Sequence, residues 1–240
     1  EDGIRDFCLS RGLGDVYKRQ VPTKVSDEKV EVAVLPKEFI PLWKTKKSLY
    51  RGHALKFLKD RGFDNYDIKK YKIGYCEEGL YQHRIIVPSH DEHGMLNYFV
   101  GRSYMESGMK YKNPNVSKDV VGFDYFIAWS EPIVLCEGVF DAMSIRSNAI
   151  PMFGKKPPTK LLMKIFEKKV KTVYIALDDD AKKEAYMLGE FFSDIGIDSK
   201  VVNLPKDKDP NDLGFKEMTK LLSKTISSSF SDTIQARLYG

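Results

Sequence analysis

The first part of the chain, from Pro36 to Trp129, has the hydrophobic pattern of helices followed by strands. Four apolar residues at helical spacing predict a helix that Gly62 ends, and residues 64–71 favour a second, short helix. The four are Ala54, Leu55, Phe57 and Leu58. The strands expected after these helices are residues 73–76, 85–87 and 96–100, the last two joined as a hairpin by a polar turn. The segment MKYKNP that follows is expected to be a basic, aromatic loop.

From Glu131 onward, apolar runs of strand length alternate with segments of helical pattern. The expected strands lie near residues 133–136, 149–153, 172–177 and 200–204, and residues 216–222 are expected to close this part as a helix. Such alternation predicts a mostly parallel sheet with crossover helices. The predicted fold class is therefore α/β, with an α+β subdomain in front of a mostly parallel sheet that helices flank.

The domain organisation predicted from these patterns has four segments. They are an extraneous or disordered segment at 1–20, a basic N-terminal subdomain at 21–130, a second domain at 131–227, and a tail or truncated boundary at 228–240. The first segment has no clear period, and the serine-rich stretch SSSFSD near the end is typical of a linker.

The composition fits a folded protein: of 240 residues, 42% are hydrophobic and 30% are charged. No apolar run is long enough to span a bilayer, so we expect no membrane partner and a cytoplasmic protein. Cys8, Cys76 and Cys136 are far apart and form no CxxC pair, and no cysteine stands at zinc-finger spacing from a histidine. Neither disulfides nor zinc are therefore expected. The formal charge of +5 excludes no function class by itself.

Carboxylates follow the apolar stretches of the second part. Glu137 ends IVLCE, Asp178–Asp180 end TVYIALDDD, and KDPND stands where the next strand should finish. Because parallel strands bring their carboxyl ends to one edge of a sheet, these acids are expected to converge there. Carboxylate oxygens are the ligands that Mg²⁺ prefers, so the pattern predicts a site for magnesium or manganese.

The individual acids are expected to have different roles. In an extended strand end, Asp178 and Asp180 would point to one side and Asp179 to the other. Asp209 and Asp212 are further candidate metal ligands, from a loop that Pro210 restrains. Two ions about 4 Å apart could then support the attack of a hydroxyl on a phosphate.

Two residues just after Glu137 are expected to support the site. Gly138 leaves room for a phosphate at the start of the next helix. Asp141 follows Glu137 by one helical turn, so it either supports the metal site or caps that helix.

A group of polar residues around the expected hairpin are candidate contacts to nucleic acid or nucleotide. They are Arg84, Arg102, Lys110, Lys112 and Asn113. Tyr104 and Tyr111 stand among them, and basic residues interleaved with aromatic ones favour contacts to phosphates and bases. The alternative is an ordinary solvated face.

Several motifs, in one collinear order over about residues 50–214, resemble bacterial and phage primases of the DnaG type. They are LKFLKDRGFDNYDIKKYKIGYC, RIIVPSHDEHGMLNYFVGR, KYKNP, EGVFDA, LDDDA and KDPND. The last three are similar to the three motifs of a Toprim domain, a Rossmann-like fold. Collinear motifs are a much stronger signal than any one of them.

The resemblance implies a DNA primase, a DNA-directed RNA polymerase that makes short RNA primers on single-stranded DNA during replication. It implies that Glu137, Asp178 and Asp180 are catalytic and that Mg²⁺ or Mn²⁺ is the cofactor. The implied partners are single-stranded template DNA, ribonucleoside triphosphates and a replicative helicase, the last through regions absent from this sequence. The zinc module that precedes this core in the family is also absent, and a phage protein of this kind would act in the host cytoplasm.

Two other function classes stay open from the residues. One is a different Toprim enzyme, a nuclease or topoisomerase, against which the primase-like first half argues. The other is a non-catalytic module that binds single-stranded nucleic acid. Ribonucleotide incorporation distinguishes all three.

Overall fold

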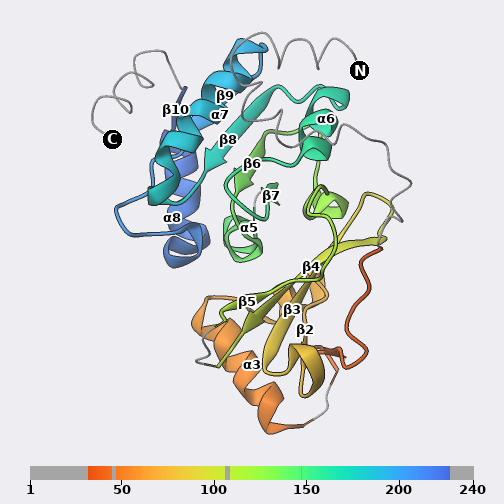
Figure 1. Cartoon of the computed structure of the whole chain (residues 1–240). Coiled ribbons are helices and arrows are strands. Elements are labelled where there is room, and N and C mark those ends of the chain that lie inside the picture. The colour runs from red at the N-terminus through yellow and green to blue at the C-terminus, as the bar shows by residue number, and fades with distance from the viewer. Residues whose placement is uncertain (1–31, 45–46, 106–108, 147, 228–240) are drawn as a thin grey trace. The chain divides into compact units, whose positions relative to one another are not determined.

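The computed structural model describes residues 32–44, 47–105, 109–146 and 148–227 of the chain (Figure 1). From Val32 onward the chain forms one compact unit, which contains two five-stranded sheets. The segments predicted at 1–20 and 228–240 lie outside the described residues. The boundary predicted between 130 and 131 stays a prediction, since the described residues on both sides of it belong to one compact unit.

The first sheet is antiparallel, and its strands follow the order of the sequence. They are β1 (Ile40–Pro41), β2 (Gly74–Cys76), β3 (Arg84–His90), β4 (Leu96–Ser103) and β5 (Tyr111–Lys112). The predicted hairpin is confirmed as β3 and β4, which are longer than expected. The expectation of a plain loop at MKYKNP was wrong, because Tyr111 and Lys112 pair with Arg102 and Gly101 and extend the sheet by one short strand.

Two helices precede the long strands of this sheet: α3 (Leu49–Asp60) and α4 (Asn65–Lys70). Ser48 caps the N-terminus of α3: its Oγ accepts a hydrogen bond from the backbone N–H of Arg51 at 3.0 Å. It ends as predicted before Gly62, whose φ of +82° is a conformation that glycine adopts at low cost. Its fully buried residues belong to the same core as the inner residues of β3, so the helix packs on this sheet.

The second sheet has the order β10-β9-β8-β6-β7. Its strands are β6 (Ile133–Cys136), β7 (Ala149–Pro151), β8 (Thr172–Ala176), β9 (Asp198–Val201) and β10 (Ile226–Ser227). The first four are parallel and β10 is antiparallel, which confirms the mostly parallel sheet. The strand expected near 200–204 begins and ends earlier than predicted, because the chain leaves the ladder after Val201.

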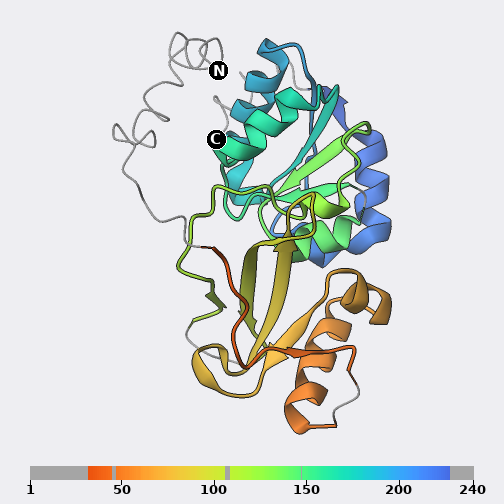
Figure 2. The ribbon, with the colours of Figure 1, turned by 90° about the vertical axis from the view of Figure 1, so that its right-hand side faces the viewer.

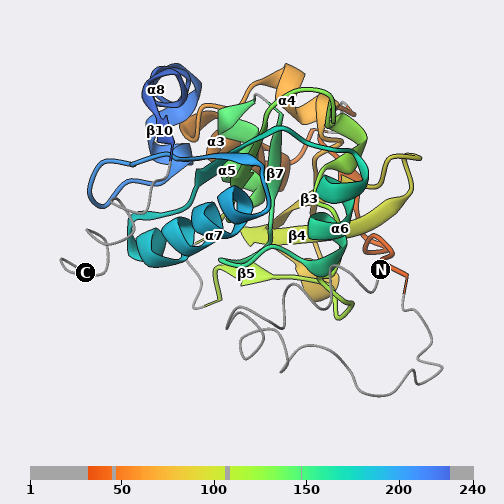
Figure 3. The ribbon, with the colours of Figure 1, turned by 90° about the horizontal axis from the view of Figure 1, so that it is seen from above.

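Helices cover both faces of the second sheet: α5 and α8 lie on one face and α6 and α7 on the other (Figure 3). Their bounds are α5 (Val139–Ile145), α6 (Thr159–Glu167), α7 (Lys182–Asp194) and α8 (Pro210–Lys224). Helix α8 begins six residues before the predicted one, because Asp209 caps its N-terminus and Pro210 suits the first helical position. At Gly214, whose φ is +68°, the helical geometry is interrupted. No helix in the described part of the chain is both long and apolar enough to cross a membrane.

The hairpin of β3 and β4 reaches from the first sheet toward the second (Figure 2). Near its turn, Glu92 forms ion pairs with Lys164 at 3.0 Å and with Lys168 at 3.2 Å, both around α6. Lys164 also pairs with the buried Asp124, which lies in the short 3₁₀ helix η2 (Asp124–Phe126). These contacts, with a core cluster that includes residues of both sheets, hold α6 and the second sheet against the first subdomain.

Candidate metal centre and nucleic-acid face

The acidic cluster forms where two neighbouring parallel strands end. Cys136 at the end of β6 is paired with Ala176 at the end of β8, so the chain leaves both strands at the same edge of the sheet. One carboxylate oxygen from each of Glu137, Asp178 and Asp180 lies within 4.8 Å of the others. Glu137 also accepts a hydrogen bond from the backbone N–H of Asp178 at 3.4 Å, which ties the two strand ends together.

The charges in this cluster repel one another in a partly buried place. Burial first, and then the charge of Asp178, raises the pKa of Glu137 to about 7. Burial, followed by the charges of Asp209 and Asp180, raises the pKa of Asp178 to about 6. Asp178 Oδ1 is also buried without a hydrogen-bond partner among the described residues. A hard divalent cation would satisfy that oxygen and offset the repulsion, so the residues present fit such an ion.

The expected alternation of Asp178, Asp179 and Asp180 along an extended strand end was wrong. Strand β8 stops at Ala176, and Asp179–Ala181 form the 3₁₀ turn η3. Asp178 and Asp180 meet through this turn, while Asp179 forms an ion pair with Lys182 in the first turn of α7. Asp178 and Asp180 therefore lie on the same side, as predicted, but because the backbone turns and not because side chains alternate along an extended strand.

Asp209 and Asp212 lie at the start of α8. The Asp209 carboxylate accepts a hydrogen bond from the backbone N–H of Asp212 at 2.6 Å and so caps the helix. Neither residue belongs to the group of three oxygens within 4.8 Å, but both charges raise the pKa of Asp178. They therefore lie in the same electrostatic environment, and their role as metal ligands stays a prediction.

Asp141 is buried beneath the cluster and caps the short helix α5. Its carboxylate accepts a hydrogen bond from the backbone N–H of Gly138 at 3.0 Å. Burial, followed by the charges of Asp178 and Asp209, raises the pKa of Asp141 to about 8. A Cβ added at Gly138 would stand 3.0 Å from the same carboxylate oxygen, so glycine suits this close approach. Of the two roles considered for Asp141, the cap is present.

Arg84 is buried rather than exposed to a ligand. Its guanidinium donates hydrogen bonds to the carbonyl oxygens of Lys110 at 3.2 Å and Met109 at 2.9 Å. Two of its nitrogens are thus used to hold the start of β5. This differs from the phosphate contact expected for Arg84, because the donors face backbone carbonyls.

The other predicted basic residues surround β5. The Arg102 guanidinium lies over the ring of Tyr111 at 4.6 Å from its centroid, and the two residues are cross-strand partners. Lys110 is exposed, and Lys112 and Asn113 are half-buried. Burial raises the pKa of Tyr111, on which the charges of Arg102, Asp141 and Arg61 also act. The aromatic face of the first sheet therefore lies within electrostatic reach of the acidic domain.

Arg61 is a candidate binding residue that sequence reasoning missed. Its guanidinium lies 4.8 Å from the Phe57 ring centroid, and its Nη1 donates to Asn211 Oδ1 at 2.6 Å. It lines a hollow of about 570 Å³ between the end of α3 and the start of α8. The other lining residues are Phe57, Asp60, Gly62, Asn211, Asp212, Leu213 and Gly214. Arg61 and Gly62 form the RG pair of the motif LKFLKDRGFDNYDIKKYKIGYC, and this pair was the available signal in the sequence. The pattern alone, however, indicates only the end of a helix.

Lys155 was also missed. Its Nζ lies 2.8 Å from Asp180 Oδ2, although the residue belongs to the loop between β7 and α6. No sequence signal indicated this, since a lysine in an irregular loop follows no period.

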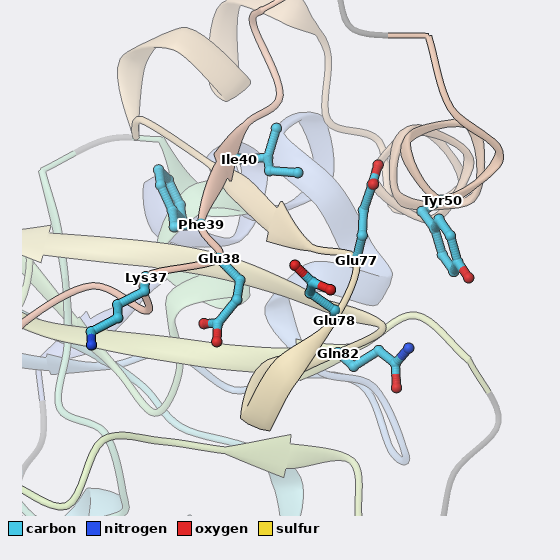
Figure 4. Close-up of a pocket in the computed structure, with 8 residues that line it drawn as sticks. All are labelled: Lys37, Glu38, Phe39, Ile40, Tyr50, Glu77, Glu78 and Gln82. Carbon is cyan, nitrogen blue, oxygen red and sulfur yellow. The ribbon is translucent and has the colours of Figure 1, made fainter.

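A second hollow, of about 530 Å³, lies beside the edge strand β1 (Figure 4). Three of its lining residues are the acids Glu38, Glu77 and Glu78, with Tyr50 from α3 beside them. The remaining lining residues are Lys37, Phe39, Ile40 and Gln82. The excess of negative charge makes this hollow unsuitable for a phosphate backbone.

Comparison with known proteins agrees with this architecture. Residues 134–214 match the family described as Toprim-like. The uncharacterized protein MG010 of Mycoplasma genitalium is 29% identical over 181 residues, which cover 70% of this chain and 81% of that protein. A DNA primase of Clostridium acetobutylicum is 24% identical over 198 residues, which cover 74% of this chain and 33% of that primase. The chain thus spans about a third of the length of that primase.

The fold is similar to that of solved primase cores. The structure of a DnaG primase catalytic domain bound to single-stranded DNA superposes with a TM-score of 0.68 at 16% identity. The superposition covers 80% of this chain and 77% of that one. The chain therefore contains a Toprim-like domain and has the fold of the catalytic core of DnaG-type primases.

Proposed function

We propose that this chain is the catalytic core of a DNA primase, which joins ribonucleotides into short primers on a single-stranded DNA template. The observation that carries the proposal is the convergence of Glu137, Asp178 and Asp180 at the carboxyl edge of β6 and β8. This convergence occurs within a fold similar to that of primase catalytic cores. The relative described as a DNA primase supports the same activity.

The proposed catalytic residues are Glu137, Asp178 and Asp180, which would also hold a divalent cation, magnesium or manganese. Bound there, such an ion would neutralise charge on the oxygens of the reacting phosphate. Asp209 and Asp212 are proposed as additional ligands, because their charges act on Asp178. Asp141 would keep the start of α5 in position through its bond to Gly138.

The template and the incoming nucleotide are proposed to contact the first sheet around β5. Arg102, Lys110, Lys112 and Asn113 would bind phosphates, and Arg61 would add a positive charge on the side of α8. The stack of Arg102 on Tyr111 supports this, because such a pair offers both a charge and an aromatic surface. Arg84 would act indirectly, by holding the backbone of Met109 and Lys110.

The test is incorporation of labelled ribonucleotides on single-stranded DNA in the presence of Mg²⁺ or Mn²⁺. We expect short RNA products from the wild type and none from Asp178→Asn. Asp179→Asn is the matched control, because Asp179 pairs with Lys182 outside the group of three. DNA cleavage without RNA synthesis would instead indicate a nuclease, and DNA binding without either reaction would indicate a non-catalytic module.

A further inference from the structure

Lys155 is a positive charge inside the acidic cluster. Its Nζ donates a hydrogen bond to Asp180 Oδ2 at 2.8 Å. The charge of Lys155 also lowers the pKa of Glu137 and of Asp178, against the larger effect of burial. One ammonium group thus acts on all three carboxylates that converge at the strand ends.

The loop that carries Lys155 is fixed on both sides. On one side, the ring of Phe153 packs against Tyr98 with a centroid distance of 4.7 Å. On the other side, Pro157 is buried and precedes a second proline at the start of α6. Because prolines restrict the backbone, these contacts limit where the loop can place Lys155.

The ion pair itself can exchange easily. The Lys155 side chain is 39% exposed and the Asp180 side chain is 74% exposed, so water and salt screen the attraction. Exposed pairs of this kind contribute little to stability, and many contribute nothing measurable. A divalent cation held by the three converging carboxylates would draw on the same Asp180 carboxylate that Lys155 contacts.

We propose that Lys155 is an intramolecular competitor of the divalent metal: it holds Asp180 while the site is free of metal and releases it when the ion binds. This inference rests on the metal-dependent function proposed above. Lys155 is a positioning residue in this account, because it acts through Asp180. It would set the metal concentration at which the site fills.

Metal binding by the whole chain, without nucleotide or DNA, tests this competition. Isothermal titration with Mn²⁺ and with Mg²⁺ would compare the wild type with Lys155→Met, Lys155→Arg and Lys156→Met. Lys156 is the adjacent, exposed lysine and serves as the matched control. We expect Lys155→Met to bind the ion about two- to tenfold more tightly, because the competing charge and its repulsion of the ion are both removed. Lys155→Arg and Lys156→Met should remain near the wild type.

Salt supplies a second readout that a purely structural role of Lys155 would not affect. The difference between Lys155→Met and the wild type should shrink as the ionic strength rises, because salt screens the exposed pair. Thermal melting of each variant checks that it is folded. If Lys155→Met binds Mn²⁺ and Mg²⁺ no more tightly than the wild type does, the inference is overturned, but the proposed metal site is not. Failure of every variant to bind either ion would instead overturn the metal-dependent function and the inference with it.

Discussion

Arg146 Nη2 lies 2.7 Å from Asp67 Oδ2, and this ion pair joins the end of α5 to the first turn of α4. The two residues are 79 positions apart in the sequence. The Asp67 side chain is only 1% exposed, and it also accepts a hydrogen bond from the backbone N–H of Asp64 at 3.0 Å. The pair therefore connects α5 beside the second sheet to α4 beside the first, with the Asp67 end of the pair buried.

Removal of Asp67 should destabilise the protein. Asp67→Ala leaves Arg146 without its partner and removes one side of the capping box of α4, so we expect a loss of about 2 kcal/mol in the free energy of unfolding. Urea denaturation followed by circular dichroism measures the change. Asp60→Ala is the control: Asp60 pairs with Lys56 on an exposed helix surface, and its loss should cost less than about 0.5 kcal/mol. Equal effects of the two variants would contradict the interpretation.

Substitutions in the acidic cluster should separate chemistry from folding. Glu137→Gln, Asp178→Asn and Asp180→Asn should each reduce primer synthesis by about 100-fold or more, since each removes a proposed metal ligand. Their unfolding free energies should not fall, because neutralisation removes repulsion among carboxylates. Asp179→Asn should retain most activity. Time courses of ribonucleotide incorporation, with urea denaturation in parallel, test this, and a loss at Asp179 as large as at Asp178 would refute the division of roles.

The stability of the metal-free protein should fall as the pH rises. Asp141 has a folded-state pKa of about 8, above its usual value near 4, so the folded state binds its proton more tightly than the unfolded state does. The resulting stabilisation is complete below about pH 4 and is lost as the pH rises through about 8. Within this window, one such group lowers the free energy of unfolding by at most about 1.4 kcal/mol per pH unit.

Asp141→Asn tests this assignment, because an asparagine oxygen can still accept the bond from Gly138 but does not titrate. Melting temperatures in a chelating buffer between pH 6 and 9 should decline less steeply in Asp141→Asn than in the wild type. Part of the decline should remain in Asp141→Asn, because Glu137, with a pKa of about 7, also titrates in this range. Identical slopes in the two proteins would exclude Asp141 as the titrating group.

Basic residues near β5 should control the salt dependence of DNA binding. Replacing Arg102, or Lys110 together with Lys112, by Ala should weaken single-stranded DNA binding. The slope of log affinity against log salt should become shallower by about 0.7 for each phosphate that the variant no longer neutralises. Fluorescence anisotropy at several salt concentrations measures these slopes. Glu78→Ala, in the acidic hollow beside β1, is the control and should leave the slope unchanged. A wild-type slope in the Arg102 and lysine variants would show that the template binds elsewhere.

Local patterns in the sequence determined the elements and their order. The apolar runs before Glu137 and before Asp178 predict β6 and β8, because a short, continuous apolar run is typical of a strand that is buried on both faces. The alternation of strands and helices predicts the parallel sheet, and parallel strands must end at one edge. The convergence of acids at that edge follows from these two facts without knowledge of any side-chain position.

Only the tertiary structure decided how the chain continues after each strand and which distant residues meet there. Once the ladder of β8 ends, no strand hydrogen bond holds the chain extended, and Asp179–Ala181 turn instead of alternating. The contacts of Arg61 with Asn211 and of Lys155 with Asp180 join segments 150 and 25 positions apart. Such pairs depend on how the helices and loops pack over the sheets, because packing fixes distances that the periodicity of a single segment does not contain.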